Sequence, residues 1–457
     1  MRLSYSIAWL LMSFASESVC SEAEAQLQRG QVDKNVGDVV GGDIAQGSNL
    51  ASTSIDSLVE VHEVIVTLED FPDKPSIRHE QEKKNLMKRL SKSHGKWDTN
   101  HPRHRLMEAL FGFSRYKVRQ MAELNRWKDL YTHVPKAQKK LLEKSIGYSK
   151  KFETTEQLHD LNQDLCNEIV ETALGYYGIS HEELAAHSKA KDAANQLADR
   201  VSVSQALKHF VRDWSTSGRG EREDAFPCIL STMQTLFPER SGAGVKVLLP
   251  GSGLGRLGHE IASLSGFQVT VNEWSMFMNL AYRFLEGHPK VGAKSVHPFI
   301  DSWSHHATNA DMFRGVSFPD RRVNASSVLL VEGDFVSEFK NHKEQYDAVV
   351  THFFIDTARN AMSYFETIHA TLKKGGYWVN FGPLLWGTGP FVQLSLDEIV
   401  LIAKDMGFEF VDADESCGDI TVEGERIRGK QAVYGFNERA LTRNAYSAQF
   451  WVARRIL

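Results

Sequence analysis

The sequence has few cysteines, no long block of basic residues and no apolar run long enough to span a membrane. Its four cysteines, Cys20, Cys166, Cys228 and Cys417, lie far apart in the 457-residue chain and form no Cys-x-x-Cys pair. This spacing argues against a structural zinc site and against a disulfide framework. The formal net charge is only -5, so the composition gives no sign of a nucleic-acid partner. A chain of this length can hold two domains, or one large domain with an extension.

The first 55 residues differ from the rest of the chain. An apolar run from Ile7 to Ala15 follows Arg2 and precedes small residues around Cys20. This pattern is typical of a secretory signal peptide, and the run is shorter than the roughly 20 residues of a membrane-spanning helix. An N-terminus that is apolar without being a signal is an equal alternative. Residues 22–55 are polar, glycine-rich and free of aromatics, so we expect a disordered linker there.

The stretch from Val245 to Glu273 predicts a strand, a glycine turn, a helix and a second strand. Its first apolar run suits a strand buried on both faces of a parallel sheet. Gly251, Gly253 and Gly255 follow at once, and glycines there can take positive φ and let the backbone approach a ligand. The second strand ends at Glu273, whose carboxylate can accept hydrogen bonds from ribose hydroxyls. A nucleoside cofactor is therefore expected at this turn.

The glycine spacing separates two classes of nucleoside cofactor. A dinucleotide fingerprint has the form G-x-G-x-x-G, but Arg256 occupies the place of its third glycine. The G-x-G-x-G form found here is similar to motif I of class I S-adenosylmethionine (SAM) methyltransferases. On this motif alone two alternatives stay open: an NAD-dependent oxidoreductase, and a turn without catalytic function, as in a nucleoside-binding module.

Acidic residues follow three of the predicted strands. Residues 241–457 alternate strands and helices, as an α/β doubly wound domain does, with a helix over 361–372 capped by LKKGG and a last strand over 447–454. Ligands of open α/β sheets bind outside the carboxyl ends of the strands, so Glu273, Asp334 and Asp356 are expected to converge on one crevice. One such acid is more often a helix cap, but three in successive strands favour a site.

The N-terminal part is expected to be helical. Apolar residues recur at helical spacing over 105–131 and 155–174, and a helix between them is expected to begin near Pro135. An apolar alternation over 58–68 suggests a strand without assigned function. Further along, Arg212 lies beside aromatic residues, where a guanidinium suits a bidentate carboxylate clamp. The alternative is a charge on the solvated face of an amphipathic helix.

Several segments together resemble carnosine N-methyltransferases, a class I SAM-dependent family that methylates the imidazole of β-alanyl-histidine to give anserine. They are FVRDWS, PGSGLGRLGHEIA, NEWSMFM, EGDF, VVTHFFIDTARN and LKKGGYWVNFGPLL. The resemblance covers roughly His104 to the C-terminus, and NEWS with FFIDTA is much more specific than the glycine turn. It implies a Rossmann-like class I methyltransferase fold, a SAM cofactor and a histidine-containing dipeptide as substrate.

The resemblance also implies a cofactor site. In the family pattern, Arg212 binds the methionine carboxylate, while Gly251 and Glu273 hold the methionine side and the ribose. Asp334 and Phe335 hold the adenine. Two positions depart from the family: a histidine replaces the usual Gln at 209 and can still donate a hydrogen bond, and another replaces the usual Cys at 352, where a core histidine is the alternative. The candidate cofactor-binding residues are His209, Arg212, Gly251, Gly253, Glu273, Asp334, Phe335 and His352.

For catalysis and substrate binding, the resemblance points to Asp356 and Tyr446. Methyl transfer needs a neutral nitrogen lone pair aligned with the methyl group, so positioning supplies most of the catalysis. A carboxylate such as Asp356, accepting the N–H of the other ring nitrogen, fixes the tautomer and stabilises the imidazolium as charge develops. Tyr446 would wall the pocket or bond the dipeptide, plain packing being the alternative. The family commonly reads PLLYH where this chain has Gly387, so another imidazole compound, small peptide or protein histidine stays open as acceptor.

The sequence thus predicts four parts: a signal or targeting segment at 1–21, a linker at 22–55, an N-terminal helical region at 56–240 and a Rossmann-like SAM-dependent methyltransferase domain at 241–457. The expected partners are a histidine-containing dipeptide and, as an open alternative, a second copy in a homodimer, without nucleic acid, a membrane span or a metal. A SAM-using enzyme with free cysteines suits a reducing compartment, so the cytosol or nucleus is expected, with the secretory pathway or an organelle as alternative.

Overall fold

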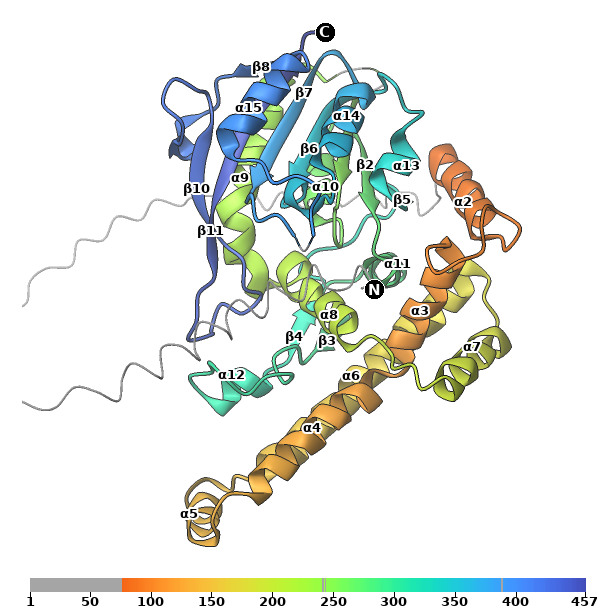
Figure 1. Cartoon of the computed structure of the whole chain (residues 1–457), viewed down its shortest axis with the longest axis vertical. Helices are drawn as coiled ribbons and strands as arrows, with labels where there is room; N and C mark the ends of the chain where they lie inside the picture. Colours follow the sequence, from red (N-terminus) through yellow and green to blue (C-terminus); the bar gives the residue numbers. More distant parts are fainter. Residues whose placement is uncertain (1–75, 241, 243, 388) are drawn as a thin grey trace, which may run out of the picture. The chain divides into compact units, whose positions relative to one another are not determined.

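The computed structural model describes residues 76–240, 242, 244–387 and 389–457. The predicted signal segment, the linker and the strand at 58–68 lie outside these residues. Helices fill the described chain up to residue 236, and strands alternate with helices from residue 245 onward (Figure 1). None of the described helices is both long enough and apolar enough to cross a membrane.

The N-terminal helices differ from the prediction in number and length. The single helix expected over 105–131 is in fact two helices, separated by a break at Arg115. The break could not be predicted because the apolar spacing continues across it. The helix after Pro135 is confirmed, and the one expected over 155–174 is the middle of a longer helix. The described helices of this part are α2 (Ile77–Leu90), α3 (Pro102–Ser114), α4 (Tyr116–Thr132), α5 (Lys136–Ile146), α6 (Lys150–Tyr177), α7 (His181–Ala193), α8 (Arg200–Trp214) and α9 (Arg219–Leu236).

One large sheet organises the rest of the described chain. Its order is β5-β2-β1-β6-β7-β11-β10-β9. β10 pairs with the N-terminal half of β11, and β8 pairs with its C-terminal half. The five strands from β5 to β7 are parallel, whereas β11 is antiparallel to β7. The strands are β1 (Val245–Pro250), β2 (Phe267–Glu273), β5 (Val328–Glu332), β6 (Tyr346–His352), β7 (Leu372–Gly382), β8 (Phe408–Val411), β9 (Asp419–Ile420), β10 (Arg428–Val433) and β11 (Ala445–Arg455), with β3 (Lys294–Val296) and β4 (Val316–Phe318) forming a separate pair.

Helices cover both faces of this sheet, which confirms the predicted α/β doubly wound fold. Alternate residues of β1 belong to different hydrophobic clusters: Val247 and Leu249 pack with α9 and α10, whereas Leu248 packs with α14 and α15. Figure 1 shows the strands between these two groups of helices. The remaining helices are α10 (Arg256–Ser263), α11 (Met276–Gly287), α12 (Asn309–Phe313), α13 (Phe335–Phe339), α14 (Ala361–Thr371) and α15 (Leu396–Asp405).

Two sequence predictions are wrong in this part of the chain. The segment Lys373–Gly376 does not cap a helix, because α14 ends at Thr371 and β7 already begins at Leu372. Pairing with β6 across a register shift holds this segment in the sheet, and it overrides the local preference of the two glycines for a helix end.

The second wrong prediction concerns the cysteines. Cys228 of α9 and Cys417 form a disulfide, although 189 positions separate them in the sequence. Both are buried, because α9 packs against β10 and brings the turn before β9 close to it. Sequence distance hides such proximity, and only one described cysteine, the buried Cys166, is free.

Candidate functional site

The glycine turn has the backbone geometry that its sequence predicts. Gly251 and Gly253 both have left-handed φ angles, +64° and +57°. A Cβ added to Gly251 would lie 2.2 Å from the ring of Phe354, and one on Gly253 would lie 3.2 Å from Nδ1 of His209. Both positions therefore favour glycine by conformation, and Gly251 also requires it by space. Helix α10 begins directly after the turn and directs its first N–H groups toward the same edge of the sheet.

Glu273 closes this turn from the end of β2. Its Oε2 accepts a 2.9 Å hydrogen bond from the amide of Gly253, and its Oε1 accepts a 2.7 Å bond from the amide of Ser275. Burial raises the pKa of Glu273, while these amides oppose that rise. The amide of Trp274 also donates to this carboxylate, and because a carboxylate has about four acceptor positions, acceptor capacity remains for a ribose hydroxyl. The structure thus brings Glu273 and Gly253 together as predicted.

The last turn of α8 places a cluster of charged residues beneath the glycine turn. Arg212 donates 2.8 Å hydrogen bonds to Oδ1 of Asp213 and to Nδ1 of His209. Oδ2 of Asp213 also lies 3.3 Å from the amide of Leu254, so the cluster is tied to the turn itself. Burial opposes both charges, yet Asp213 raises the pKa of Arg212 and Arg212 lowers the pKa of Asp213, so both remain ionised.

His209 contacts the guanidinium of Arg212 through Nδ1 of its ring, and its predicted hydrogen bond to the cofactor stays a prediction. Burial, with the neighbouring positive charge of Arg212, lowers the pKa of His209 to about 4, so the ring is neutral at physiological pH. Nδ1 lies 2.8 Å from the guanidinium of Arg212 and 3.3 Å from Oδ2 of Asp213. A guanidinium has no acceptor, so the shorter contact requires Nδ1 to be unprotonated, and the longer contact with the carboxylate is then not a hydrogen bond. Toward Arg212, His209 accepts a hydrogen bond and does not donate one. It thereby orients the guanidinium that was predicted as a carboxylate clamp.

Two further arginines hold the backbone of this cluster from behind. Arg222 donates to the carbonyl oxygens of Arg212 and Ser215, and Arg256 donates to the carbonyl of Asp213. Both guanidiniums are ion-paired with Asp320, and Arg256 is only 8% exposed. The arginine in the third glycine's place is therefore a structural support of the turn.

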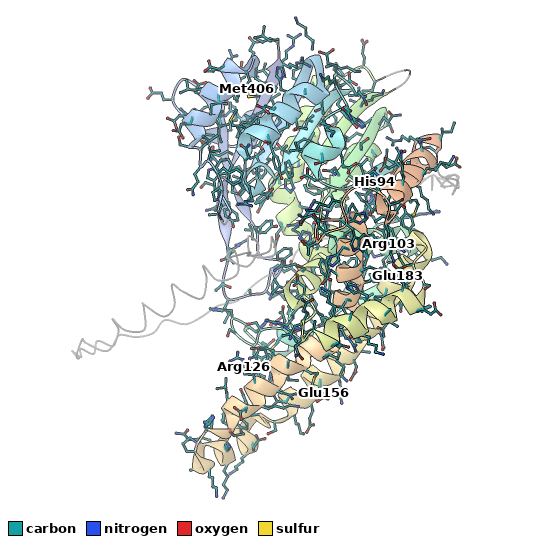
Figure 2. All side chains as sticks on the ribbon, turned by 45° about the vertical axis from the view of Figure 1, so that its right-hand side comes forward. His94, Arg103, Arg126, Glu156, Glu183 and Met406 are labelled. Atoms are coloured by element: carbon teal, nitrogen blue, oxygen red, sulfur yellow. A yellow bond between two sulfur atoms is a disulfide. The ribbon has the colours of Figure 1, made fainter. Side chains whose placement is uncertain are left out.

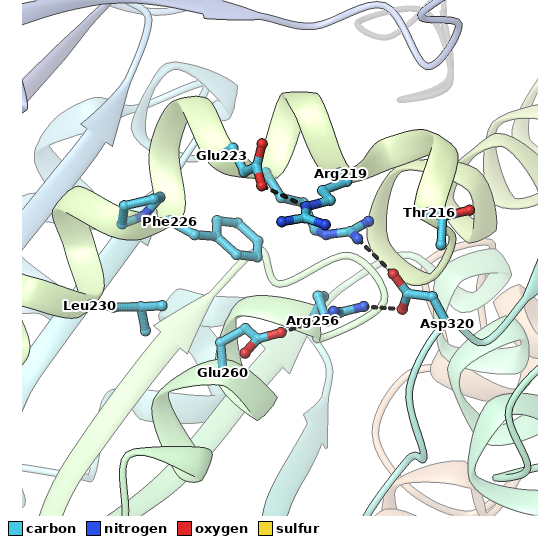
Figure 3. Close-up of a pocket in the computed structure, with 10 residues that line it drawn as sticks. Thr216, Arg219, Glu223, Phe226, Leu230, Arg256, Glu260 and Asp320 are labelled. Carbon is cyan, nitrogen blue, oxygen red and sulfur yellow. Dashed lines mark hydrogen bonds and ion pairs between the residues drawn. The ribbon is translucent and has the colours of Figure 1, made fainter. Parts of the chain in front are cut away.

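A cavity of about 380 Å³ lies beside these arginines, and none of the candidate site residues lines it (Figure 3). Its charged side chains pair with one another: Arg219 with Glu223, and Arg256 with both Asp320 and Glu260. This cavity is thus stabilised by its own ion pairs and is separate from the predicted site. It is lined by Thr216, Arg219, Arg222, Glu223, Phe226, Pro227, Leu230, Arg256, Glu260 and Asp320.

At the end of β5, Asp334 and Phe335 begin helix α13. Oδ1 of Asp334 accepts hydrogen bonds from the amide and hydroxyl of Ser337, at 2.9 and 2.7 Å, so this acid is a helix cap as well as a site candidate. The ring of Phe335 is buried in the core, 5.5 Å from that of Phe354. Any contact of Phe335 with an adenine would therefore come mainly from its main chain.

Asp356 is a buried carboxyl in the 3₁₀ turn that follows β6. It is 2% exposed, and its Oδ2 accepts a 3.0 Å hydrogen bond from the amide of Leu385. Burial raises its pKa to about 7. The main-chain carbonyl of Asp356 accepts from the amide of Gly387, so the segment with the altered family motif lies against this acid. A buried carboxyl with so few partners is available to a ligand that brings an N–H group.

Aromatic rings line the space beside Asp356. The ring of Phe353 stacks on Tyr434 at 5.0 Å and lies 6.0 Å from Tyr446, and Phe353 has a left-handed φ of +51° that is rare for a bulky residue. Tyr434 also lies 4.9 Å from the guanidinium carbon of Arg212. The charge of Asp356 contributes, after burial, to the raised pKa of Tyr446. Tyr446 was predicted from the sequence, whereas Phe353 and Tyr434, which show no periodic signal, were not.

The surroundings of His352 suit a core histidine better than a cofactor ligand. It ends β6 among the rings of Phe226, Phe353 and Phe381. Burial, with Arg212 nearby, lowers its pKa to about 3, so it is neutral. Its position beside Arg212 still leaves a cofactor contact as a prediction.

Comparison with known proteins decides the family. The profile for carnosine N-methyltransferase matches residues 189–456. The chain belongs to the carnosine N-methyltransferase family. It is 33% identical over 276 residues to the carnosine N-methyltransferase of Schizosaccharomyces pombe, covering 55% of this chain and 70% of that protein. It is 28% identical over 365 residues to the Mus musculus carnosine N-methyltransferase, covering 77% of this chain and 86% of that protein. The resemblance seen in the sequence is thereby confirmed.

Among solved structures, a phosphoethanolamine N-methyltransferase of Haemonchus contortus in complex with S-adenosyl-L-methionine is 16% identical, with a TM-score of 0.30 over 46% of this chain and 42% of that one. S-adenosylmethionine is the methyl donor of the carnosine N-methyltransferase family, and the described residues fit it. The left-handed backbone of Gly253, the acceptors of Glu273 and the cation of Arg212 lie at the same turn.

Proposed function

We propose that this chain transfers a methyl group from SAM to an imidazole ring nitrogen of carnosine, with Asp356 as the catalytic acceptor of the ring N–H. The observation that carries the proposal is the buried Asp356 carboxyl beside the aromatic rings of Phe353, Tyr434 and Tyr446. It follows β6, the strand next to β1, whose end carries the glycine turn. When bound, SAM supplies a methyl group on a positively charged sulfur.

The cofactor would be held at two ends. Arg212 has five N–H donors, and its bonds to Asp213 and His209 leave others for the methionine carboxylate. Glu273 keeps acceptor capacity for the ribose hydroxyls, and Asp334 with the main chain of Phe335 would meet the adenine. These assignments agree with the family pattern that the sequence carries.

Asp356 would orient the acceptor. An imidazole nitrogen attacks only when its lone pair is free, so the proton must sit on the other ring nitrogen. A carboxylate that accepts this N–H fixes that tautomer, and it stabilises the positive ring that forms as the methyl group is transferred. Burial strengthens this attraction because no water screens it. Tyr446 and Phe353 would hold the ring in place and present aromatic faces to the developing cation.

A second class of acceptor follows from Gly387. In the family motif a histidine side chain stands here, whereas this chain offers only backbone, whose amide donates to the carbonyl of Asp356. The absence of that side chain leaves room for a larger imidazole ligand, such as a histidine within a protein or peptide.

One experiment separates these acceptors. The full chain is incubated with methyl-labelled SAM and a panel of carnosine, histidine, histamine and histidine-containing peptides, and mass spectrometry with NMR locates the methyl group. We expect efficient transfer to a ring nitrogen of carnosine. Preferential methylation of a peptide histidine would support the second class, and no transfer to any imidazole would contradict both.

A further inference from the structure

One side chain of helix α3, that of Arg105, contacts the turn that follows β2. The guanidinium carbon of Arg105 lies 3.9 Å from the ring centroid of Trp274, and the same guanidinium donates a hydrogen bond to the main-chain oxygen of Trp274. Trp274 directly follows Glu273, so Arg105 contacts both the ring and the backbone of this turn. A stacked, hydrogen-bonded arginine fixes a turn more firmly than a solvated one. The contact links the N-terminal helices to the ribose side of the site.

The charges around Arg105 point the same way. Burial lowers the pKa of Arg105 to about 10, against the opposing effect of carboxylates on Glu273, Asp334 and Glu332. Glu332 already has other partners, because Arg283 and the hydroxyl of Tyr177 both bond to its carboxylate. The positive charge of Arg105 is therefore left for Glu273 and Asp334, the two acids at the nucleoside crevice.

We propose that Arg105 is a positioning residue for the nucleoside half of the cofactor, acting through the Glu273–Trp274 turn. It holds this turn so that the Glu273 carboxylate faces the glycine loop, and its charge offsets the repulsion between two neighbouring acids. The helical part of the chain thereby completes the methyl-donor site. This inference rests on the proposed function, since it assumes that SAM binds at this turn.

A fragment of the cofactor tests which end Arg105 serves. 5′-Methylthioadenosine contains the adenosine part of SAM but lacks the amino-acid carboxylate. If Arg105 acts on the nucleoside half, Arg105→Ala weakens binding of SAM and of this fragment by the same factor, about 10-fold or more. Arg212→Ala should instead weaken SAM and leave the fragment nearly unaffected.

The experiment uses calorimetric binding to the full chain, with melting temperatures to verify folding. Arg103→Ala is the matched control, since Arg103 lies on the same helix but pairs with Glu183 of α7 at 3.0 Å (Figure 2). Arg105→Lys keeps the charge without the flat stacked group, so an intermediate loss is expected and serves if the alanine variant does not fold.

Two outcomes would overturn the inference. One is a folded Arg105→Ala variant, or failing that Arg105→Lys, that binds both ligands like the wild type. The other is a loss confined to SAM, which would place Arg105 at the methionine end. If the wild-type chain itself binds no SAM, the proposed function fails first, so the two failures are distinguishable.

Discussion

Nη2 of Arg212 lies 2.8 Å from Nδ1 of His209, and a neutral imidazole thus accepts a hydrogen bond from the predicted carboxylate clamp. The family usually has Gln here, whose amide oxygen can accept the same bond. We therefore expect His209→Gln to keep SAM affinity within about 3-fold, whereas His209→Ala should lower it about 10-fold by freeing the guanidinium. Calorimetry measures both. Equal losses for Gln and Ala would show that the ring, and not its acceptor, matters.

Glu273→Ala should weaken SAM binding by about 1–3 kcal/mol, because the ribose loses a charged hydrogen-bond acceptor. The substitution also removes the acceptor of the Gly253 amide. Glu223→Ala is the control, since Glu223 pairs with the exposed Arg219 outside the crevice. An unchanged affinity for Glu273→Ala would remove this residue from the ribose site.

The raised pKa of Asp356 predicts a pH-dependent cost in stability. Its folded-state pKa is about 7, above the ordinary value of 3.8, so the folded protein binds this proton more tightly than the unfolded chain. The cost is absent below the unfolded pKa and is fully present once the pH exceeds the folded pKa. Asp356→Asn should therefore raise Tm more at about pH 8 than at about pH 5, measured by calorimetry without ligand. An equal change at both pH values would contradict the buried ionisable carboxyl.

The Cys228–Cys417 disulfide should stabilise the packing of α9 against β10, the strand that Tyr434 directly follows. Beside it, Asp224 and Glu221 of α9 accept hydrogen bonds from the amides of Val433 and Gly435. Replacing both cysteines with serine should lower the free energy of unfolding by about 2–4 kcal/mol, as measured by denaturant titration. Non-reducing peptide mapping of the purified chain should recover the two peptides linked. Complete alkylation of both thiols without reductant would contradict the bond.

Sequence patterns predicted the centre of the fold because its signals are local. Gly251, Gly253 and the buried strand before them lie within a few residues, and period and turn chemistry define such units. The acids after the strands were predicted to lie at one crevice because parallel strands end at the same sheet edge. The cysteine pair and the aromatic wall of Phe353 and Tyr434 could not be predicted in this way, since they join segments far apart in the chain.

Other site features depend on atoms that sequence does not reveal. The direction of the His209 hydrogen bond follows from burial and from a neighbouring guanidinium. Packing changes at the break at Arg115, because α3 buries seven of its 13 residues and α4 only three of its 17. Arg105 lies within a helical pattern and shows its contact with Trp274 only in three dimensions.

The most direct test of the central claim compares methyl transfer and SAM affinity in Asp356→Ala. The control is Asp347→Ala. Asp347 pairs with Lys373 at 2.6 Å and lies near the start of β6, whereas Asp356 follows the end of this strand. We predict that Asp356→Ala loses carnosine methylation while its SAM dissociation constant stays within about 3-fold of wild type, and that the control keeps both. Full methylation by Asp356→Ala, or an equal loss of SAM binding, would contradict the assignment of Asp356 to the acceptor.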